Sequence, residues 1–130
     1  MGNAKVNIGS ITMPAGEYYV GDPCYAVDDH DRWMKWLEDA DYMSNPRYLL
    51  ADLDGQPALG IGTAFGDGTY LGSDGNEYGV DAGLLGVVPV EVAEDNALHA
   101  MQRVTFDQPF ECSYDEGTIN LGHIQIDTDV

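Results

Sequence analysis

The chain has few basic residues. Of its 130 residues only five are Lys or Arg, against 23 Asp or Glu, and the formal net charge is −18. No basic residue lies between Arg47 and Arg103, and none follows Arg103. So acidic a surface repels nucleic acids and anionic membranes, because both are bound through Lys and Arg that displace counterions. We therefore expect no direct nucleic-acid contact and no membrane contact, and a basic protein surface as the partner.

Cysteines and long apolar runs are also scarce. Cys24 and Cys112 are the only cysteines, too few for a disulfide framework, so we expect both thiols to be reduced. No apolar run approaches the ~18 residues of a membrane span, and residues 1–10 lack the apolar core of a signal peptide. These absences predict a cytoplasmic protein. The length suits a single domain, residues 1–130, with a packed core.

Two segments have helical patterning. Residues 28–42 repeat apolar side chains at helical spacing, and Asp28 or Asp29 is placed to cap the N-terminus. A second, short helix is expected at about residues 94–102. The apolar stripe of the first helix comprises Trp33, Trp36, Leu37 and Ala40, and that of the second comprises Ala97, Leu98 and Met101.

The rest of the chain alternates short apolar segments with turn signals, as antiparallel hairpins do. Asp54-Gly55 favours a tight turn between strands at 48–53 and 58–65, and the apolar run 83–90 predicts a central buried strand. We expect three further hairpins, pairing 5–12 with 17–20, 69–71 with 77–80, and 110–114 with 118–126. The predicted fold is α+β, mostly antiparallel β hairpins forming a twisted sheet or partial barrel.

Asp22 and Cys24 are the candidates for catalysis. A thiol just before a helix can have a lowered pKa, and a Cys–His pair with His30 would be a nucleophile. The many acids around this segment would instead raise the pKa of the thiol, which favours a packed thiol in a turn. An alternative hypothesis is a small hydrolase or ligand-binding enzyme. Its site would lie around the two Gly-Asp loops, which begin at Gly21-Asp22 and Gly66-Asp67.

The Gly-Asp loops raise the question of metal binding. Asp67 and Asp81, with Asp74 and Glu77 nearby, offer the hard oxygen ligands that Ca²⁺ and Mg²⁺ prefer. Their spacing does not match the twelve-residue calcium loop, and Asp-Gly pairs are also the residues that tight turns require. A divalent-cation-binding module is the third hypothesis. No cofactor is expected, because the paired glycines lack the following helix and Lys of a phosphate-binding loop.

Acids spaced two residues apart occur at Asp29/Asp31, Asp52/Asp54 and Asp127/Asp129. On a strand such pairs lie on one face about 6.6 Å apart, which is the scale of successive phosphates in a nucleic acid. The simpler interpretation is that these acids form a solvated surface, which keeps the protein soluble or adapts it to a high-salt environment. The hypothesis favoured here is a binding surface that includes Asp52, Asp54, Asp67, Asp74, Glu77, Asp81, Asp127 and Asp129.

Three motifs carry a family resemblance. They are GDPCY at residues 21–25, GDGTY…VDAG at residues 66–83, and DEGTINLGHIQIDT at residues 115–128. In this order they resemble a group of small uncharacterised proteins from bacteria and their phages. The resemblance implies a shared fold and a phage or mobile-element origin, without site residues to transfer. It favours an inhibitor that docks on a basic surface of a host nucleic-acid-processing or defence protein, as a mimic of nucleic acid.

Overall fold

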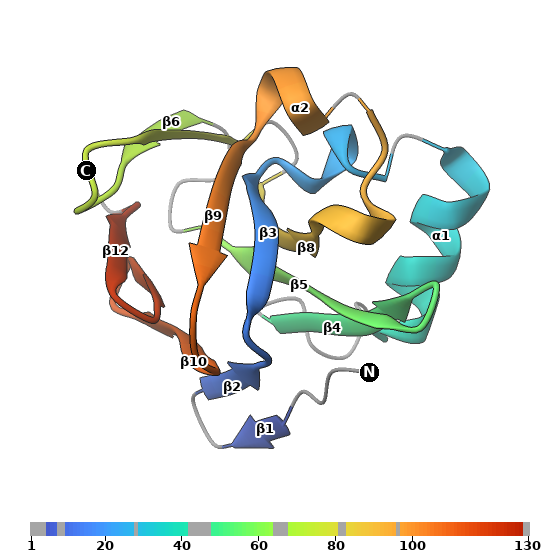
Figure 1. The fold of residues 1–130 in the computed structure, drawn as a ribbon, viewed down its shortest axis with the longest axis horizontal. Coiled ribbons are helices and arrows are strands. Elements are labelled where there is room, and N and C mark those ends of the chain that lie inside the picture. Colours follow the sequence, from blue (N-terminus) through green and yellow to red (C-terminus); the bar gives the residue numbers. More distant parts are fainter. Residues whose placement is uncertain are drawn as a thin grey trace.

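Two five-stranded antiparallel sheets and a two-stranded hairpin form the framework (Figure 1). The computed structural model describes residues 5–7, 10–27, 29–41, 48–63, 68–80, 83–95 and 97–128. In this part of the chain the strands do not close into a barrel. The expected α+β class, built mostly from antiparallel strands, is confirmed.

The two sheets take their strands from different parts of the chain. Sheet A has the order β1 (Lys5–Asn7), β2 (Ser10–Met13), β10 (Phe110–Asp115), β11 (Thr118–Leu121) and β12 (Ile124–Asp127). Sheet B has the order β4 (Tyr48–Leu53), β5 (Gln56–Gly62), β8 (Leu84–Pro89), β3 (Gly16–Gly21) and β9 (Gln102–Phe106). The separate hairpin consists of β6 (Gly68–Leu71) and β7 (Glu77–Val80).

The main helix, α1, runs from His30 to Asp39 and is shorter than the predicted 28–42. Asp29 is its N-cap, as predicted, and its carboxylate accepts hydrogen bonds from the backbone N–H groups of Asp31 and Arg32. Two residues beyond its end, Asp41 has a φ of 54°, a left-handed conformation that takes the chain out of the helix. None of the helices described is long and apolar enough to cross a membrane.

The second helix, α2, is a single turn from Ala97 to Ala100. Ala97 and Met101 face inward as predicted, but Leu98 is 61% exposed, so its predicted burial is wrong. One turn buries only one side, and positions 97 and 101 take that side because they lie four residues apart. Two 3₁₀ turns, η1 (Pro23–Tyr25) and η2 (Val90–Val92), complete the described elements.

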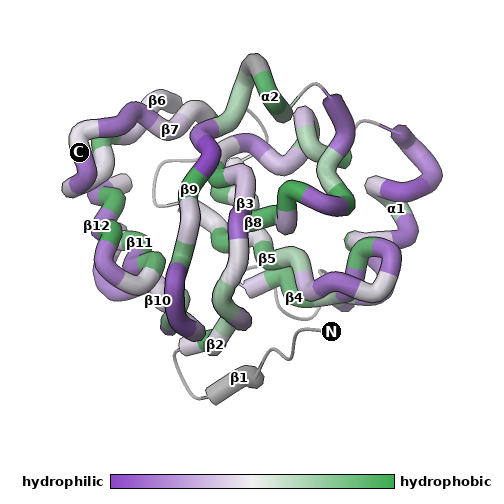
Figure 2. The backbone as a smooth tube through the Cα atoms, viewed as in Figure 1, coloured by the Kyte–Doolittle hydropathy of each residue, from purple (hydrophilic) through white to green (hydrophobic). Residues whose placement is uncertain are grey.

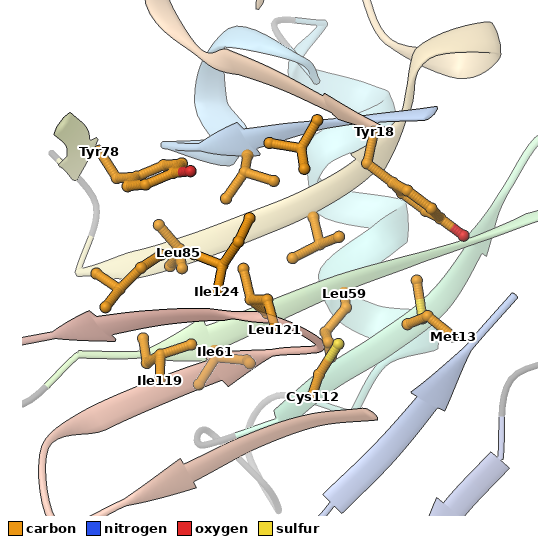
Figure 3. Close-up of a cluster of buried hydrophobic side chains, with 14 of the residues drawn as sticks. Met13, Tyr18, Leu59, Ile61, Tyr78, Leu85, Cys112, Ile119, Leu121 and Ile124 are labelled. Atoms are coloured by element: carbon orange, nitrogen blue, oxygen red, sulfur yellow. The ribbon is translucent and has the colours of Figure 1, made fainter. Parts of the chain in front are cut away.

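The larger core lies between the two sheets and the β6–β7 hairpin (Figure 3). Side chains from both sheets meet there, among them Met13, Leu59, Ile61 and Ile119, each at most 1% exposed. Tyr18 also enters this core, where its hydroxyl donates to Pro14 O at 2.6 Å. Burial raises the pKa of Tyr18 to about 12, so the phenol stays neutral.

The second core lies on the other face of sheet B, beneath α1. Trp36 is 1% exposed, and its indole covers Gly60 of β5, where an added Cβ would meet Trp36 Cη2 at 3.0 Å. The absence of a side chain at Gly60 therefore allows Trp36 to pack closely on the strand. Trp33, Leu37 and Ala40 pack at the edge of the same core, which confirms the predicted apolar stripe.

Strand pairing departs from the prediction at both ends of the chain. Segments 5–12 and 17–20 do not form a hairpin, because β2 pairs with β1 and β10 whereas β3 pairs with β8 and β9. Residues 118–126 form two strands rather than one, since Gly122 has a φ of 58° and turns the chain there. Strand β9 was not predicted, and Gln102, placed in the helix, begins it.

Candidate binding surface

Asp22 and Cys24, the candidates for catalysis, lie in a tightly packed turn. Asp22 is 1% exposed, and its Oδ1 accepts the backbone N–H of Cys24 at 2.9 Å, which caps η1. Cys24 is half-buried, Cys112 is buried in the sheet core, and both are free thiols. Burial raises the pKa of the Cys112 thiol well above its ordinary value. Neither Asp22 nor Cys24 lines the cavities of about 650 Å³ and 420 Å³ found in the described part of the chain.

The first two motifs lie next to each other in the fold. A Cβ added at Gly21 would lie 3.6 Å from Gly79 O of β7, and one added at Gly86 would lie 2.6 Å from Pro23 Cβ. The turn at residues 21–25 thus rests on β8 beside β7. Asp67 and Asp81, the candidate metal ligands, lie outside the described residues. Within the described ranges, no group of three or more His, Cys, Asp or Glu side chains is arranged to hold a metal ion.

Asp74 serves the β6–β7 turn. Its Oδ2 accepts the Tyr78 hydroxyl at 2.6 Å and the Asn76 amide at 3.0 Å, and its Oδ1 accepts the Asn76 backbone N–H. Burial works to raise the pKa of Asp74, but these hydrogen bonds outweigh it and hold the pKa below its ordinary value. Burial, reinforced by the Asp74 carboxylate, raises the pKa of Tyr78. Asp74 thus stabilises the turn, and its side chain is exposed.

Tyr78→Phe is expected to lower the free energy of unfolding by about 1–2 kcal/mol at pH 7, because a partly buried hydrogen bond to a carboxylate is lost. The folded-state pKa of Asp74 is lowered, so the stability it contributes is present above its unfolded pKa. That stability is lost as the pH falls through the folded pKa. Urea unfolding of the wild type and the variant between pH 7 and pH 2.5 measures the difference, which should shrink below about pH 4.

The control for this prediction is Asp74→Asn, which removes the titrating group. In that background Tyr78→Phe should have an effect that no longer depends on pH in the acid range. A Tyr78→Phe effect that is equally large at pH 7 and pH 2.5 in the wild-type background would show that the carboxylate is not what stabilises the turn.

The third motif is tied to the second through the same hairpin. The backbone N–H of Ser73 donates to Gln125 O at 2.8 Å, and the backbone N–H of Gln125 donates to Ser73 Oγ at 2.9 Å. On the other side, Gln102 Nε2 donates to Glu77 O at 3.1 Å, although the Glu77 side chain itself is exposed. The β6–β7 hairpin therefore connects sheet A at β12 to sheet B at β9, and the three motifs have structural roles.

Basic side chains in the described part of the chain are all paired with acids. Arg32 donates to Glu94 at 2.8 Å, to Asp54 at 3.2 Å and to Val92 O at 2.9 Å. Lys35 pairs with Asp39, as the helical spacing predicts, and Arg103 pairs with Glu17. The side chains of Lys5 and Arg47 lie outside the described structure. These four ion pairs neutralise acids that lie on α1 and sheet B or in the turns beside them.

The C-terminal strands of sheet A contain acids but no lysine or arginine. Residues 107–128 contain five acids and no Lys or Arg, and all five acids are exposed. Glu111 and Asp115 share one face of β10, and Thr118 of β11 pairs with both Asp115 and Asp127. We call these five residues the sheet A acids: Asp107, Glu111, Asp115, Glu116 and Asp127.

Four of the sheet A acids were not in the predicted binding surface, which named Asp127 alone among them. The signal for two of them was present in FECSYD, where Phe110 and Cys112 are buried and Glu111 and Asp115 alternate with them. The hairpin predicted between residues 110–114 and 118–126 places Asp115 in its turn. The turn itself is confirmed, since Glu116 and Gly117 have φ values of 49° and 92°.

The predicted acid pairs are mostly not strand pairs. Asp29 caps α1 and Asp31 lies in its first turn, so the strand spacing does not apply to them. Asp52 is exposed on β4, but Asp54 lies in the tight turn with a φ of 51° and bonds Arg32. Asp129 lies outside the described residues. Asp29/Asp31 and Asp52/Asp54 therefore do not form a phosphate-like row along one strand.

The chain was compared with protein-family models, curated proteins and solved structures. No family model matches the chain, and no curated protein or solved structure gives a significant match. The resemblance carried by the three motifs stays a prediction. What the fold and its surface define is an α+β domain in which the exposed face of one sheet is acidic and, over residues 107–128, free of lysine and arginine.

Proposed function

We propose that this chain is an acidic binding protein that docks sheet A onto a basic surface of another protein. The observation that supports the proposal is the set of sheet A acids, which are all exposed in a segment without Lys or Arg. By analogy with the proteins it resembles, it is encoded by a phage or mobile element and acts in the host cytoplasm. The partner is a nucleic-acid-processing or defence protein of that host.

The two ends of the molecule differ in how their charge is compensated. Strand β12 and helix α1 lie on opposite sides, and hydrophilic segments occur on both (Figures 1 and 2). The helix side also carries exposed acids, but Arg32 and Lys35 lie among them and form ion pairs. A charge that served solubility alone would need no such difference. The sheet A acids therefore give the stronger attraction for a cationic partner.

The arrangement of the carboxylates suits a protein partner. Asp115 and Asp127 lie on strands that flank β11, so their Cα atoms are separated by two strand spacings, roughly 10 Å. Exposed carboxylates on neighbouring strands form a two-dimensional array with little desolvation cost. On a partner whose basic surface normally takes nucleic acid, they would occupy the positions of phosphates.

The test is binding of a fluorescent deca-lysine peptide at 50 mM NaCl, measured by anisotropy. The triple variant Glu111→Gln/Asp115→Asn/Glu116→Gln should bind at least about tenfold more weakly than the wild type. The matched control removes three charges from the helix side, as Glu38→Gln/Asp41→Asn/Asp52→Asn, and should bind within about twofold of the wild type. Asparagine suits position 41 because it tolerates the left-handed backbone there.

The dependence of the deca-lysine affinity on NaCl concentration is the second measurement. Wild-type binding should weaken steeply between 50 and 300 mM NaCl, because screening acts on attraction between exposed opposite charges. If both triple variants lose affinity equally, the peptide responds to net charge alone and sheet A is not a binding surface. No binding by the wild type at 50 mM NaCl would contradict the proposed function altogether.

A further inference from the structure

A groove lies at one end of sheet A, with a volume of about 650 Å³. Its walls are the connection between β9 and β10 and the turn between β11 and β12. Phe106 and Phe110 form its floor; their rings are stacked at 3.7 Å and are 4% and 5% exposed. This volume is in the range of sites that hold a ligand larger than a single ion.

Gly122 shapes one wall of the groove. Its backbone N–H donates to Glu111 O at 2.9 Å, which holds the turn against β10. A Cβ at Gly122 would lie 3.0 Å from Phe110 Cβ, so the turn approaches the floor closely because this residue lacks a side chain. The groove is therefore a consequence of how the last hairpin packs, and it is formed by regular strands and short turns.

The charged side chains that line the groove favour a cationic ligand. Asp107 and Glu111 are exposed carboxylates on the groove, and the lining contains no Lys or Arg. A metal ion does not fit, since within the described residues no three His, Cys, Asp or Glu side chains are grouped to ligate one. His123 is exposed and its ring lies 5.6 Å from that of Phe106, which offers an aromatic face. A planar cation can use both the carboxylates and such a face.

The groove also offers neutral hydrogen-bonding groups. Asn120 and Ser113 face each other across β10 and β11, with Asn120 Nδ2 donating to Ser113 Oγ at 3.2 Å. The amide oxygen of Asn120 and its second N–H can meet the backbone of a bound peptide. The groove can therefore bind two parts of a peptide: its carboxylates can bind a basic side chain, and the Asn120 amide can bind the peptide backbone.

We infer that this groove binds an arginine-bearing peptide segment of the partner. The guanidinium group lies between the carboxylates of Asp107 and Glu111, over the His123 ring, and the segment's backbone runs past Asn120. The inference rests on the proposed function and places its central contact in the groove at one end of sheet A.

The experiment is a ¹H–¹⁵N NMR titration of the full chain with the peptide Ac-Gly-Arg-Arg-Gly-NH₂ at 50 mM NaCl. Shifts should concentrate on the amides of Glu111, Gly122 and His123 and on the Asn120 side-chain amide. Asp107→Asn/Glu111→Gln should weaken the fitted affinity roughly tenfold. The matched control Glu38→Gln/Asp41→Asn removes two charges from the helix side and should weaken it no more than about twofold. The peptide with Gln in place of Arg should give no saturable shifts.

The outcomes separate this inference from the proposed function. If the Arg peptide binds but both double variants weaken it equally, or if its shifts spread over α1, the groove is not the site, and the deca-lysine comparison of the two triple variants then decides the proposed function separately. If neither this peptide nor deca-lysine binds the wild type, the proposed function fails as well. Equal binding of the Gln peptide would also overturn the assignment, because the carboxylates would then have no role.

Discussion

Trp36→Ala is expected to lower the free energy of unfolding by about 3–5 kcal/mol, the cost of removing a large aromatic side chain from a closed core. Trp36 is 1% exposed, and its ring fills the space above Gly60, which has no side chain of its own to fill it. The variant also leaves Ala51 O without the indole N–H that donates to it at 3.3 Å. Urea or thermal unfolding followed by circular dichroism measures the loss.

The matched control is Trp33→Ala, three residues away on the same helix. Trp33 is only partly buried, although its ring lies 5.6 Å from that of Trp36, so its removal should cost distinctly less. Equal losses for the two variants would show that α1 does not dock on sheet B through Trp36. The comparison thus tests the second core directly.

Gly86→Ala is expected to cost about 2–3 kcal/mol, because an added methyl group would overlap the ring of Pro23. Its Cβ would lie 2.6 Å from Pro23 Cβ and 3.1 Å from Pro23 Cα. Neither atom belongs to a flexible side chain, so the turn at residues 21–25 must shift off β8. Chemical denaturation reports the loss of stability, and ¹H–¹⁵N spectra should show the largest changes at Cys24 and Tyr25.

Gly79→Ala is the control, since Gly79 has no atom within 4 Å of its Cβ position and lies in the neighbouring strand β7. This variant should be neutral or slightly stabilising, because alanine has less conformational freedom than glycine to lose on folding. If Gly86→Ala proved as mild as Gly79→Ala, the turn would not pack on β8 as described.

The parts of the fold that the sequence predicts are those that local chemistry decides. The Asp29 cap, the stripe around Trp36 and the turn at Asp54-Gly55 each depend on residues within a few positions of one another. The buried strand at 83–90 is also confirmed as the centre of sheet B, because its unbroken apolar run leaves no solvent face.

The errors occur where distant segments decide the outcome. Strands β2 and β3 are close in sequence, yet they join different sheets because partners from β10 and β8 compete for them. The wrong prediction for Leu98 has a similar cause, since the sequence of a one-turn helix does not determine which of its sides is buried. Strand β9, with Arg103 and Thr105 facing solvent and Val104 and Phe106 facing inward, carries an alternation that was overlooked.

The sequence shows that the chain is acidic but not which of its acids form ion pairs. The excess of acidic over basic residues is evident from the sequence. The Asp-Gly pairs also predict that some acids lie in turns, as Asp54 and Asp74 do. The pairing of Arg32 with Glu94, 62 residues away, depends on tertiary structure. Only such long-range pairs show which acids are neutralised and which, like Glu111 and Asp115, are exposed on strands that contain no lysine or arginine.

The central claim is that sheet A docks on a basic protein, and affinity capture from a bacterial lysate at 50 mM NaCl tests it most directly. The wild type, the sheet A triple variant and the helix-side triple variant would be immobilised in parallel and their captured proteins identified. We predict a basic protein retained by the wild type and the helix-side variant, released by 300 mM NaCl and absent from the sheet A variant. Capture of the same proteins by all three, or of none by the wild type, would contradict the account.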